Sequence, residues 1–384
     1  MYLSDLTLLN YRNYADLELD LPKGQILLYG DNAQGKSNLI EAIYLLSIAK
    51  SYKASNERET LQLKQGKSSD KGHVIGVFQN ESVKFRVMID MQLVTSANDI
   101  NKQILRKDIT LNGSQVSASA LLGNINAVLF TVDDIELIVG SPSIRRKFLD
   151  ILICRIDKIY LRALQKYQRV LFQRNHLLRL IRDRKASVSE LEFWNDSLIY
   201  EGSYITMKRK LIVDELTSVV TPIYQKLTNT GENISLNYEP GLSTEEFAFD
   251  VLQSSFKSTL HDALDREISQ GVSQYGPQRD EVKIFLDGMD SSVFASRGQS
   301  RTLALALKLS EGNILHNETS QSPIILLDDV FSELDDSRRN LILDHVSLNE
   351  QVFISSNNKD VLRNRTVQNF TPLLVNNGSV SLVI

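Results

Sequence analysis

Apolar residues follow two different patterns along the chain. Short, nearly uninterrupted apolar runs occupy residues 25–29, 324–327 and the first part of 351–358, which is typical of buried parallel strands. Between residues 149 and 219, apolar residues instead recur at spacings of three, four and seven, which is typical of packed helices. Together the patterns predict an α/β protein in which a helical segment is inserted between strands.

The helical segment carries two heptad series. The first runs over residues 149–181 with spacings of four and three, and only Arg174 breaks it. The second recurs every seven residues over 191–219. The stretch "DRKASVSELE" separates them, and its Ser189 and Glu192 have the spacing of a capping box. We therefore expect two antiparallel helices that form a short coiled-coil-like arm.

Composition excludes several classes of protein. Of 384 residues, 42% are hydrophobic and 23% charged, as in globular proteins. Cys154 is the single cysteine and the five histidines are scattered, so neither an internal disulfide nor zinc-ligand spacing is expected. No apolar run reaches about 18 residues, so the sequence predicts no transmembrane helix and no membrane partner. A reducing, cytoplasmic location is expected.

The clearest motif joins the first strand to a helix. Residues 30–37 read GDNAQGKS and match the phosphate-loop pattern G-x-x-x-x-G-K-[ST] in its required strand–loop–helix context. Lys36 supplies a charge for the β- and γ-phosphates, and Ser37 supplies a hydroxyl for Mg²⁺. The residues expected to bind the nucleotide are Gly30, Asp31, Asn32, Ala33, Gln34, Gly35, Lys36, Ser37 and Asn38.

A pair of acids follows the strand at 324–327. Asp328 stands where a carboxylate can bind Mg²⁺ beside Ser37, and Asp329 can orient the attacking water. After the strand at 351–358, Ser356 or Asn357 is a candidate sensor of the γ-phosphate. The alternative for Asp328 alone is a turn residue at a strand end.

A second helix start also has the features of an anion site. Ser296 and Gly298 precede an Ala/Leu-rich helix that is expected to begin near Ser300. In ABC-type ATPases a signature loop, typically L-S-G-G-Q, covers the γ-phosphate that the other subunit of a dimer binds. We therefore expect Ser296, Gly298 and Gln299 to act on ATP across an ATP-dependent homodimer. An ordinary Ser/Gly helix cap is the alternative.

Positive charge gathers on the first arm helix. Residues 145–185 contain 13 Lys or Arg against three acids, in a chain with a net charge of −4. A basic face on an acidic protein is typical of binding to a phosphate backbone. A solvated helix face, or a surface for an acidic partner, is the alternative. The residues expected to contact DNA are Arg145, Arg146, Lys147, Arg155, Arg162 and Arg169.

The motifs in this order resemble the RecF family of bacterial recombination-mediator ATPases, which is related to SMC and Rad50 heads. The resemblance spans nearly the whole chain, through "LTLLNYRNYADLEL", "GDNAQGKSNLIEAIYLLSIAKSY", "LFTVDDIELIVGSPSIRRKFLD", "YGPQRDEVKIFLDG", "FASRGQSRTLALALKLSE" and "ILLDDVFSELDDSRR". It implies that Arg12 and Asn13 lie near the nucleotide and that Lys36, Ser296 and Asp329 are catalytic. Ala33 and Lys53 depart from the family, which commonly has Gly and Arg there.

The resemblance also implies function and partners. ATP and Mg²⁺ are the expected ligands, and a homodimer is expected to close on double-stranded DNA and single-strand/double-strand junctions. RecR and RecO are the implied partners, in loading RecA at single-strand gaps. The alternatives are an SMC- or Rad50-like ATPase with another role in DNA maintenance and the ATPase subunit of a membrane transporter.

The fold expected is an α/β ABC-type P-loop ATPase lobe with an inserted helical arm lobe. We expect the ATPase lobe to comprise residues 1–140 and 270–384, and the arm lobe residues 141–269.

Overall fold

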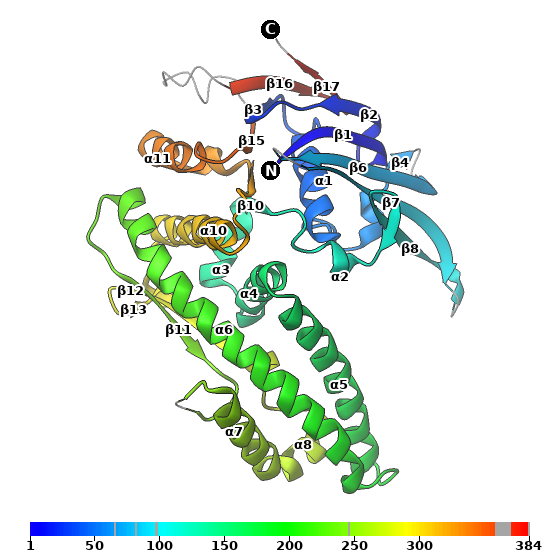
Figure 1. The fold of residues 1–384 in the computed structure, drawn as a ribbon, viewed down its shortest axis with the longest axis vertical. Coiled ribbons are helices and arrows are strands. Elements are labelled where there is room, and N and C mark those ends of the chain that lie inside the picture. The colour runs from blue at the N-terminus through cyan, green and yellow to red at the C-terminus, as the bar shows by residue number, and fades with distance from the viewer. Residues whose placement is uncertain (65–66, 81–82, 97–98, 245, 358–369, 383–384) are drawn as a thin grey trace. The chain divides into compact units, whose positions relative to one another are not determined.

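The chain forms two compact units. The computed structural model describes all residues except 65–66, 81–82, 97–98, 245, 358–369 and 383–384 (Figure 1). The first unit comprises residues 1–134 and 311–384, and the second comprises residues 135–310. The mixed α/β architecture with an inserted helical part is confirmed. Within the described residues, none of the helices combines the length and apolar character needed to cross a bilayer.

The boundaries between the units differ from those expected. The chain returns to the first unit at Glu311, within a helix, and not at residue 270. The reason is the pairing of strand β12 (Glu281–Leu286) with β11 (Ile234–Glu239) and β13 (Met289–Asp290) in a three-stranded sheet of the second unit. The segment with the signature-like loop therefore belongs to the second unit.

Two six-stranded sheets build the first unit. One is antiparallel and has the order β2 (Tyr14–Asp20), β1 (Tyr2–Tyr11), β6 (Lys71–Gln79), β7 (Lys84–Ser96), β8 (Asp99–Leu111) and β9 (Ser114–Val116). The other has the order β10 (Ala127–Thr131), β14 (Ile324–Asp328), β15 (Gln351–Ser356), β3 (Gly24–Tyr29), β16 (Phe370–Asn376) and β17 (Ser379–Leu382). Its first five strands are parallel, and the apolar runs predicted three of them, β14, β15 and β3.

Helix α1 (Lys36–Ile48) packs between these sheets. It contacts β6 and β7 of one and β10, β14 and β15 of the other. Its apolar side chains, including Leu39, Ile40 and Ile43, are buried in one core with residues of both sheets. Helix α11 (Asp336–Val346) lies on the opposite face of the parallel sheet (Figure 1). The core therefore fixes the start of α1 beside the carboxyl ends of β3 and β14.

The shorter elements of the first unit connect these layers. They are β4 (Leu63–Lys64), β5 (Lys67–Ser68), α2 (Ala118–Leu121) and the 3₁₀ helices Glu57–Thr60, Val132–Ile135 and Val330–Glu333.

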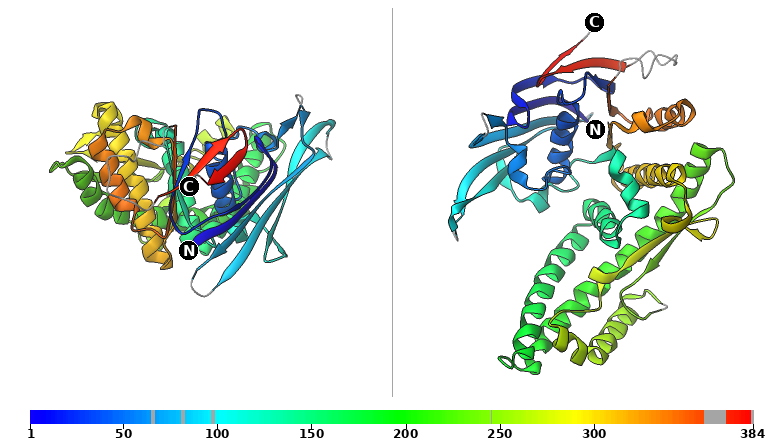
Figure 2. Two further views of the ribbon diagram at one scale, coloured as in Figure 1. Left: turned by 90° about the horizontal axis from the view of Figure 1, so that it is seen from above. Right: turned by 180° about the vertical axis from the view of Figure 1, so that it is seen from behind.

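Antiparallel helices dominate the second unit. Helices α5 (Lys158–Arg182) and α6 (Leu191–Thr228) run side by side, as Figures 1 and 2 show. The arm predicted from the heptads is thus present. The other elements are α3 (Glu136–Val139), α4 (Pro142–Ile156), α7 (Phe249–Asp262), α8 (Leu264–Gln270), α9 (Ser291–Phe294), the 3₁₀ helices Val188–Glu190 and Pro277–Arg279, and α10 (Arg297–Thr319), which continues into the first unit.

The structure corrects two details of the arm. The first heptad series is not one helix, because Asp157 takes an extended conformation between α4 and α5 and its side chain caps α5 at Ile159 and Tyr160. The capping box is formed by Ser187 and Glu190, on a 3₁₀ turn, and not by Ser189 and Glu192.

The polar residue in the first heptad series has a structural partner. Arg174 is fully buried and forms a 2.7 Å ion pair with Glu267, which is equally buried. It also donates to Asn195 at 2.8 Å and Ser273 at 2.7 Å. A buried charge is tolerated only when it is paired and hydrogen-bonded. Arg174 can therefore occupy a core position because Glu267 of helix α8 neutralises its charge.

Candidate nucleotide site

The phosphate loop requires glycine at two positions. Gly30 has φ 149°, and a Cβ there would lie 2.2 Å from the carbonyl oxygen of Val375. Gly35 has φ 121°, and a Cβ there would lie 2.6 Å from Nδ2 of Asn13. Backbone with such φ values favours glycine. The loop can therefore pass close to its neighbours and present its N–H groups at the start of α1.

Asn13, in the turn between β1 and β2, and Tyr14, at the start of β2, hold the loop in place. Asn13 Nδ2 donates to the carbonyl of Gln34 at 2.8 Å and its Oδ1 accepts from Asn38 Nδ2 at 2.8 Å. The hydroxyl of Tyr14, which is buried, donates to the carbonyl of Gly35 at 3.0 Å. Asn13 is thus joined to the loop, as the resemblance implied, and Tyr14 is a support that the motif did not reveal.

Lys36 lies along the inside of the loop. Its Nζ donates to the carbonyls of Gly30 at 2.7 Å and Asp31 at 2.8 Å. Burial lowers the pKa of Lys36, and the negative charges of Asp329, Asp31 and Asp328 oppose that shift. The ammonium is therefore held at the position from which a phosphate-loop lysine reaches phosphate oxygens.

Asp328 lies where strand β14 ends, against the start of α1. Ser37 Oγ donates to its Oδ1 at 2.7 Å, and Ser355 Oγ donates to the same oxygen at 3.0 Å. Tyr52 donates to Oδ2 at 2.7 Å, and Lys53 Nζ is 3.3 Å from Oδ2. Ser37 and Asp328, which are far apart in sequence, are thus brought together as the motifs predicted.

These oxygens suit magnesium. Mg²⁺ in nucleotide sites takes one or two protein oxygens and completes its shell with phosphates and water. A hydroxyl and a carboxylate already in contact meet that requirement. Among the described residues, no group of three or more His, Cys, Asp or Glu side chains is placed to hold a metal ion.

A hollow of about 230 Å³ opens beside the loop. Asp329, which has φ 56°, lies at its edge, and its backbone N–H donates to Ser355 Oγ at 2.8 Å. Of the two sensor candidates, Asn357 lines the hollow, while Ser356 is buried within β15. The residue that contacts the acid pair is instead Ser355. The lining residues are Asn32, Ala33, Gly35, Lys36, Ser37, Asn38, Lys53, Asp329, Ser355 and Asn357.

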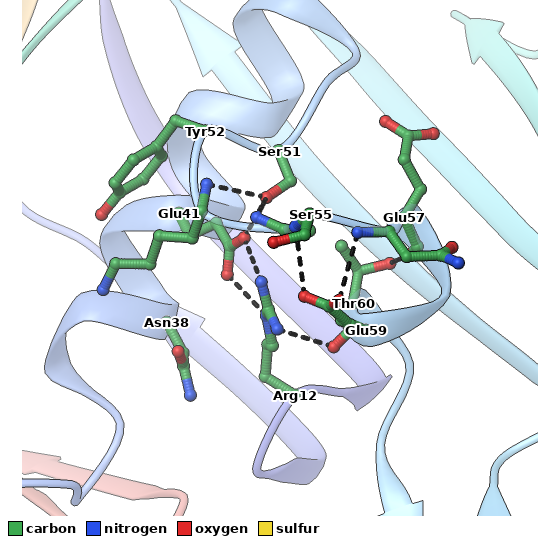
Figure 3. Close-up of polar contacts among 12 residues, drawn as sticks. Arg12, Asn38, Glu41, Ser51, Tyr52, Ser55, Glu57, Glu59 and Thr60 are labelled. Carbon is green, nitrogen blue, oxygen red and sulfur yellow. Dashed lines mark hydrogen bonds and ion pairs between the residues drawn. The ribbon is translucent and has the colours of Figure 1, made fainter.

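Arg12, which the resemblance places near the nucleotide, pairs with an acid of helix α1. Its guanidinium clasps the carboxylate of Glu41 at 2.7 and 2.8 Å and donates to the carbonyl of Glu59 at 2.8 Å (Figure 3). Burial alone would lower the pKa of Arg12, but Glu41 outweighs it and raises the pKa. Glu41 is fully buried on α1. Arg12 is thus joined to the helix that follows the loop, and its role toward the nucleotide stays a prediction.

The signature-like loop in the second unit is a helix cap. Ser296 Oγ accepts from the N–H of Gln299 at 3.2 Å, and Gln299 Oε1 accepts from the N–H of Ser296 at 2.9 Å. This reciprocal pair is a capping box. Gln299 Nε2 also donates to Glu232 at 3.1 Å. The helix begins at Arg297, earlier than expected, and Ser296 is exposed at its start.

The basic residues of α4 and α5 separate into two groups. Arg145 forms a bidentate pair with Glu281 at 2.9 and 3.1 Å, Arg146 donates to the carbonyl of Asp280 at 2.6 Å, and Arg155 is 2% exposed. The structure therefore turns these three toward the interior of the second unit, against the expectation that they face DNA. Of the six residues expected to contact DNA, the exposed ones are Lys147, Arg162 and Arg169.

Four contributors to the nucleotide site escaped sequence reasoning: Tyr14, Glu41, Tyr52 and Ser355. A polar residue within an apolar helix or strand was the only available signal for Glu41 and Ser355. No motif marks a tyrosine that reaches across from another segment.

Comparisons with known proteins identify the family. Residues 2–379 match the family described as "RecF/RecN/SMC N terminal domain". The chain is 34% identical over 382 residues to the DNA replication and repair protein RecF of Bacillus pumilus strain SAFR-032, covering 99% of this chain and all of that one.

Solved structures give the same result. A structure titled as the recombination mediator protein RecF-ATP in the RecFOR pathway matches with a TM-score of 0.89 and 32% identity, over 100% of this chain and 98% of that one. An Smc head domain derived from Pyrococcus furiosus, 17% identical with a TM-score of 0.55 over 100% and 96% of the chains, shares the fold. The chain therefore belongs to the RecF family of the RecF/RecN/SMC group.

Proposed function

We propose that the protein is an ATPase that binds DNA in an ATP-dependent way and acts in recombinational repair and replication-fork maintenance. The observation that carries the proposal is the meeting of Ser37 and Asp328, at 2.7 Å, beside the phosphate loop. The RecF-ATP structure and the name of the Bacillus pumilus relative support the same ligand and process.

In the proposed reaction the loop N–H groups and Lys36 bind the β- and γ-phosphates. Ser37 and Asp328 would hold Mg²⁺, which would supply positive charge to neutralise the phosphates. Asp329, at the edge of the hollow, orients the attacking water and accepts its proton. Ser355 fixes both acids through one hydroxyl. Hydrolysis is slow and depends on dimerisation.

The exposed helix start at Ser296 serves the ATP of a second copy. Ser296 and Gly298 approach the γ-phosphate on the opposite chain, so that ATP closes a homodimer and hydrolysis reopens it. A capping box does not conflict with this role, because the first N–H groups of a helix remain available to an anion.

DNA lies against the exposed basic residues of the arm, with Lys147, Arg162 and Arg169 facing phosphates. By family resemblance, RecR and RecO are partners, single-strand gaps and junctions are the DNA targets, and the outcome is loading of RecA in the cytoplasm. DNA stimulates hydrolysis by stabilising the closed dimer.

Two other functions give different expectations. The ATPase subunit of a transporter would be stimulated by a membrane partner, and a basic helical arm has no purpose there. An SMC-like protein would need arms hundreds of residues long, whereas α5 and α6 have 25 and 38 residues. Stimulation of ATP hydrolysis by DNA distinguishes the proposed function from the first alternative.

A mixing experiment tests the proposed dimer. Lys36→Ala damages the phosphate loop, and Ser296→Arg blocks the helix start while its own loop stays intact. Each variant alone should fail to form an ATP-dependent dimer. In a heterodimer, one site combines the intact Lys36 with an intact Ser296 of the partner subunit, so mixing should restore some dimer and hydrolysis. Loss of nucleotide binding by monomeric Ser296→Arg would contradict action across the dimer.

A second variant tests the role of Asp329. Asp329→Asn keeps the size of the side chain but removes the charge that orients water. ATP should still bind, and a closed dimer should accumulate on DNA, as sizing of the complex would show. Wild-type turnover by this variant would place the water-orienting role elsewhere.

A further inference from the structure

The donors around Asp328 are of two kinds. Three neutral hydroxyls, from Ser37, Ser355 and Tyr52, lie 2.7 to 3.0 Å from its oxygens. Lys53 brings a full positive charge, and its Nζ lies farther away, at 3.3 Å from Oδ2. One oxygen of the carboxylate therefore faces Ser37, and the other faces a cation from this chain.

Lys53 is the donor with room to move. Its side chain is 35% exposed, while that of Asp328 is 6% exposed. Lys53 also lines the hollow beside the phosphate loop, so its side chain has space on that side as well. Tyr52, in contrast, has a half-buried ring that packs edge-on against Tyr44.

The backbone that carries Lys53 is held in place. Ser51 Oγ accepts from the N–H groups of Lys53 at 3.1 Å and Ala54 at 2.8 Å, and it donates to Glu41 (Figure 3). Arg12 clamps the same carboxylate from the other side. Since Glu41 belongs to α1, these bonds join the turn at residues 51–54 to the helix that follows the phosphate loop.

We propose that Lys53 is an exchangeable counter-ion of Asp328, which a divalent metal displaces toward the hollow. The inference rests on the proposed metal role of Ser37 and Asp328. A carboxylate that is paired with an ammonium group binds a metal less strongly, because the ammonium group repels the metal ion and competes for the same negative charge. Tyr52 keeps Asp328 oriented when Lys53 leaves, and Arg12 and Glu41 act as positioning residues for the turn.

The test measures metal affinity and needs no turnover. Mn²⁺ alone is titrated into the full-length protein, and free Mn²⁺ is followed by electron paramagnetic resonance. Lys53→Gln should bind Mn²⁺ about 1.4- to 5-fold more tightly, since a partly exposed ion pair contributes about 0.2–1 kcal/mol. Lys53→Arg, which keeps the charge, should bind Mn²⁺ as the wild type does.

Lys50→Gln is the matched control, because Lys50 is exposed three residues away and carries the same charge. If Lys53→Gln leaves Mn²⁺ affinity unchanged, weakens it, or matches Lys50→Gln, the inference is overturned. The variant Asp328→Asn distinguishes failure of the Lys53 proposal from failure of the proposed metal site. It should weaken Mn²⁺ binding strongly, and wild-type affinity in Asp328→Asn would instead remove the metal role on which the inference rests.

Discussion

The nucleotide site and the basic arm were both predicted from charged and polar residues. The structure brings the predicted residues of the nucleotide site together, but it separates those of the arm. At the nucleotide site, Ser37 and Asp328 come within 2.7 Å, and Asn13 holds the loop. On the arm, three of the six basic residues turn inward, toward Glu281, toward the carbonyl of Asp280 or into the core. The remaining three are exposed.

The difference comes from what each pattern specifies. The phosphate-loop motif fixes backbone geometry, because its two glycines adopt φ values that favour glycine and its lysine follows the second one directly. A count of charges along a helix does not determine toward which side of the helix each side chain points. An arginine every few residues points to all sides of a helix with 3.6 residues per turn, and those on the inner side acquire partners in the core.

Replacing Arg174 gives the largest expected effect. The heptad pattern alone predicts that Arg174→Leu stabilises the arm, because it places an apolar residue at an apolar position. The structure predicts the opposite, because the change leaves Glu267 buried and unpaired. Loss of one partner of a buried pair costs about 3–5 kcal/mol of the free energy of unfolding, which denaturant unfolding of the full-length protein would measure.

Two controls sharpen that result. Arg169→Leu, on the exposed side of the same helix, should change stability by less than about 0.5 kcal/mol. The double variant Arg174→Leu/Glu267→Leu removes both charges and should recover a large part of the loss. Equal stability of Arg174→Leu and the wild type would mean that the heptad pattern alone describes the arm.

Removing the loop lysine should have the next largest effect. Lys36→Ala deletes charge-assisted bonds to phosphate, each of which contributes about 1.5–3 kcal/mol. Affinity for a non-hydrolysable ATP analogue should fall about 100-fold, as fluorescence titration would show. Lys50→Ala, which removes an exposed lysine with the same charge, should bind as the wild type does. Similar losses in both variants would point to net charge and not to the loop.

Sequence reasoning succeeded where a pattern constrains the backbone. Three of the parallel strands, the phosphate loop, the acid after β14 and the paired arm helices were predicted, since apolar periodicity and motif spacing report on local geometry. It failed where distant segments meet. No motif marked the pairing of Arg12 with Glu41, and the boundary expected at residue 270 missed the pairing of β11 with β12. Contacts of this kind depend on packing that no single stretch encodes.

The exposed basic residues offer a test of the arm itself. Arg162→Glu/Arg169→Glu should flatten the log–log dependence of DNA affinity on salt by about 0.9 for each phosphate that the arm no longer neutralises, measured by fluorescence anisotropy at several salt concentrations. The variant Arg86→Glu/Arg106→Glu makes the same change of charge at exposed positions on β7 and β8, and it should keep the wild-type slope. An unchanged slope in the arm variant would favour a solvated face or an acidic partner.

The smallest expected effect concerns the residue by which the phosphate loop departs from its family. Ala33 adopts φ 63°, a left-handed conformation that costs a residue with a Cβ about 1–2 kcal/mol. Glycine avoids that cost but loses more backbone freedom on folding, by about 0.4–1 kcal/mol. Ala33→Gly should therefore raise the free energy of unfolding by only about 0.5 kcal/mol, whereas Ala33→Val should lower it by at least about 1 kcal/mol, because β-branched residues tolerate positive φ poorly. Both values come from denaturant unfolding, with affinity for the ATP analogue measured in parallel. If backbone geometry determines the loop, the free energy of unfolding should fall in the order Ala33→Gly, wild type, Ala33→Val. An Ala33→Val variant as stable as the wild type would show that the loop relaxes to another conformation.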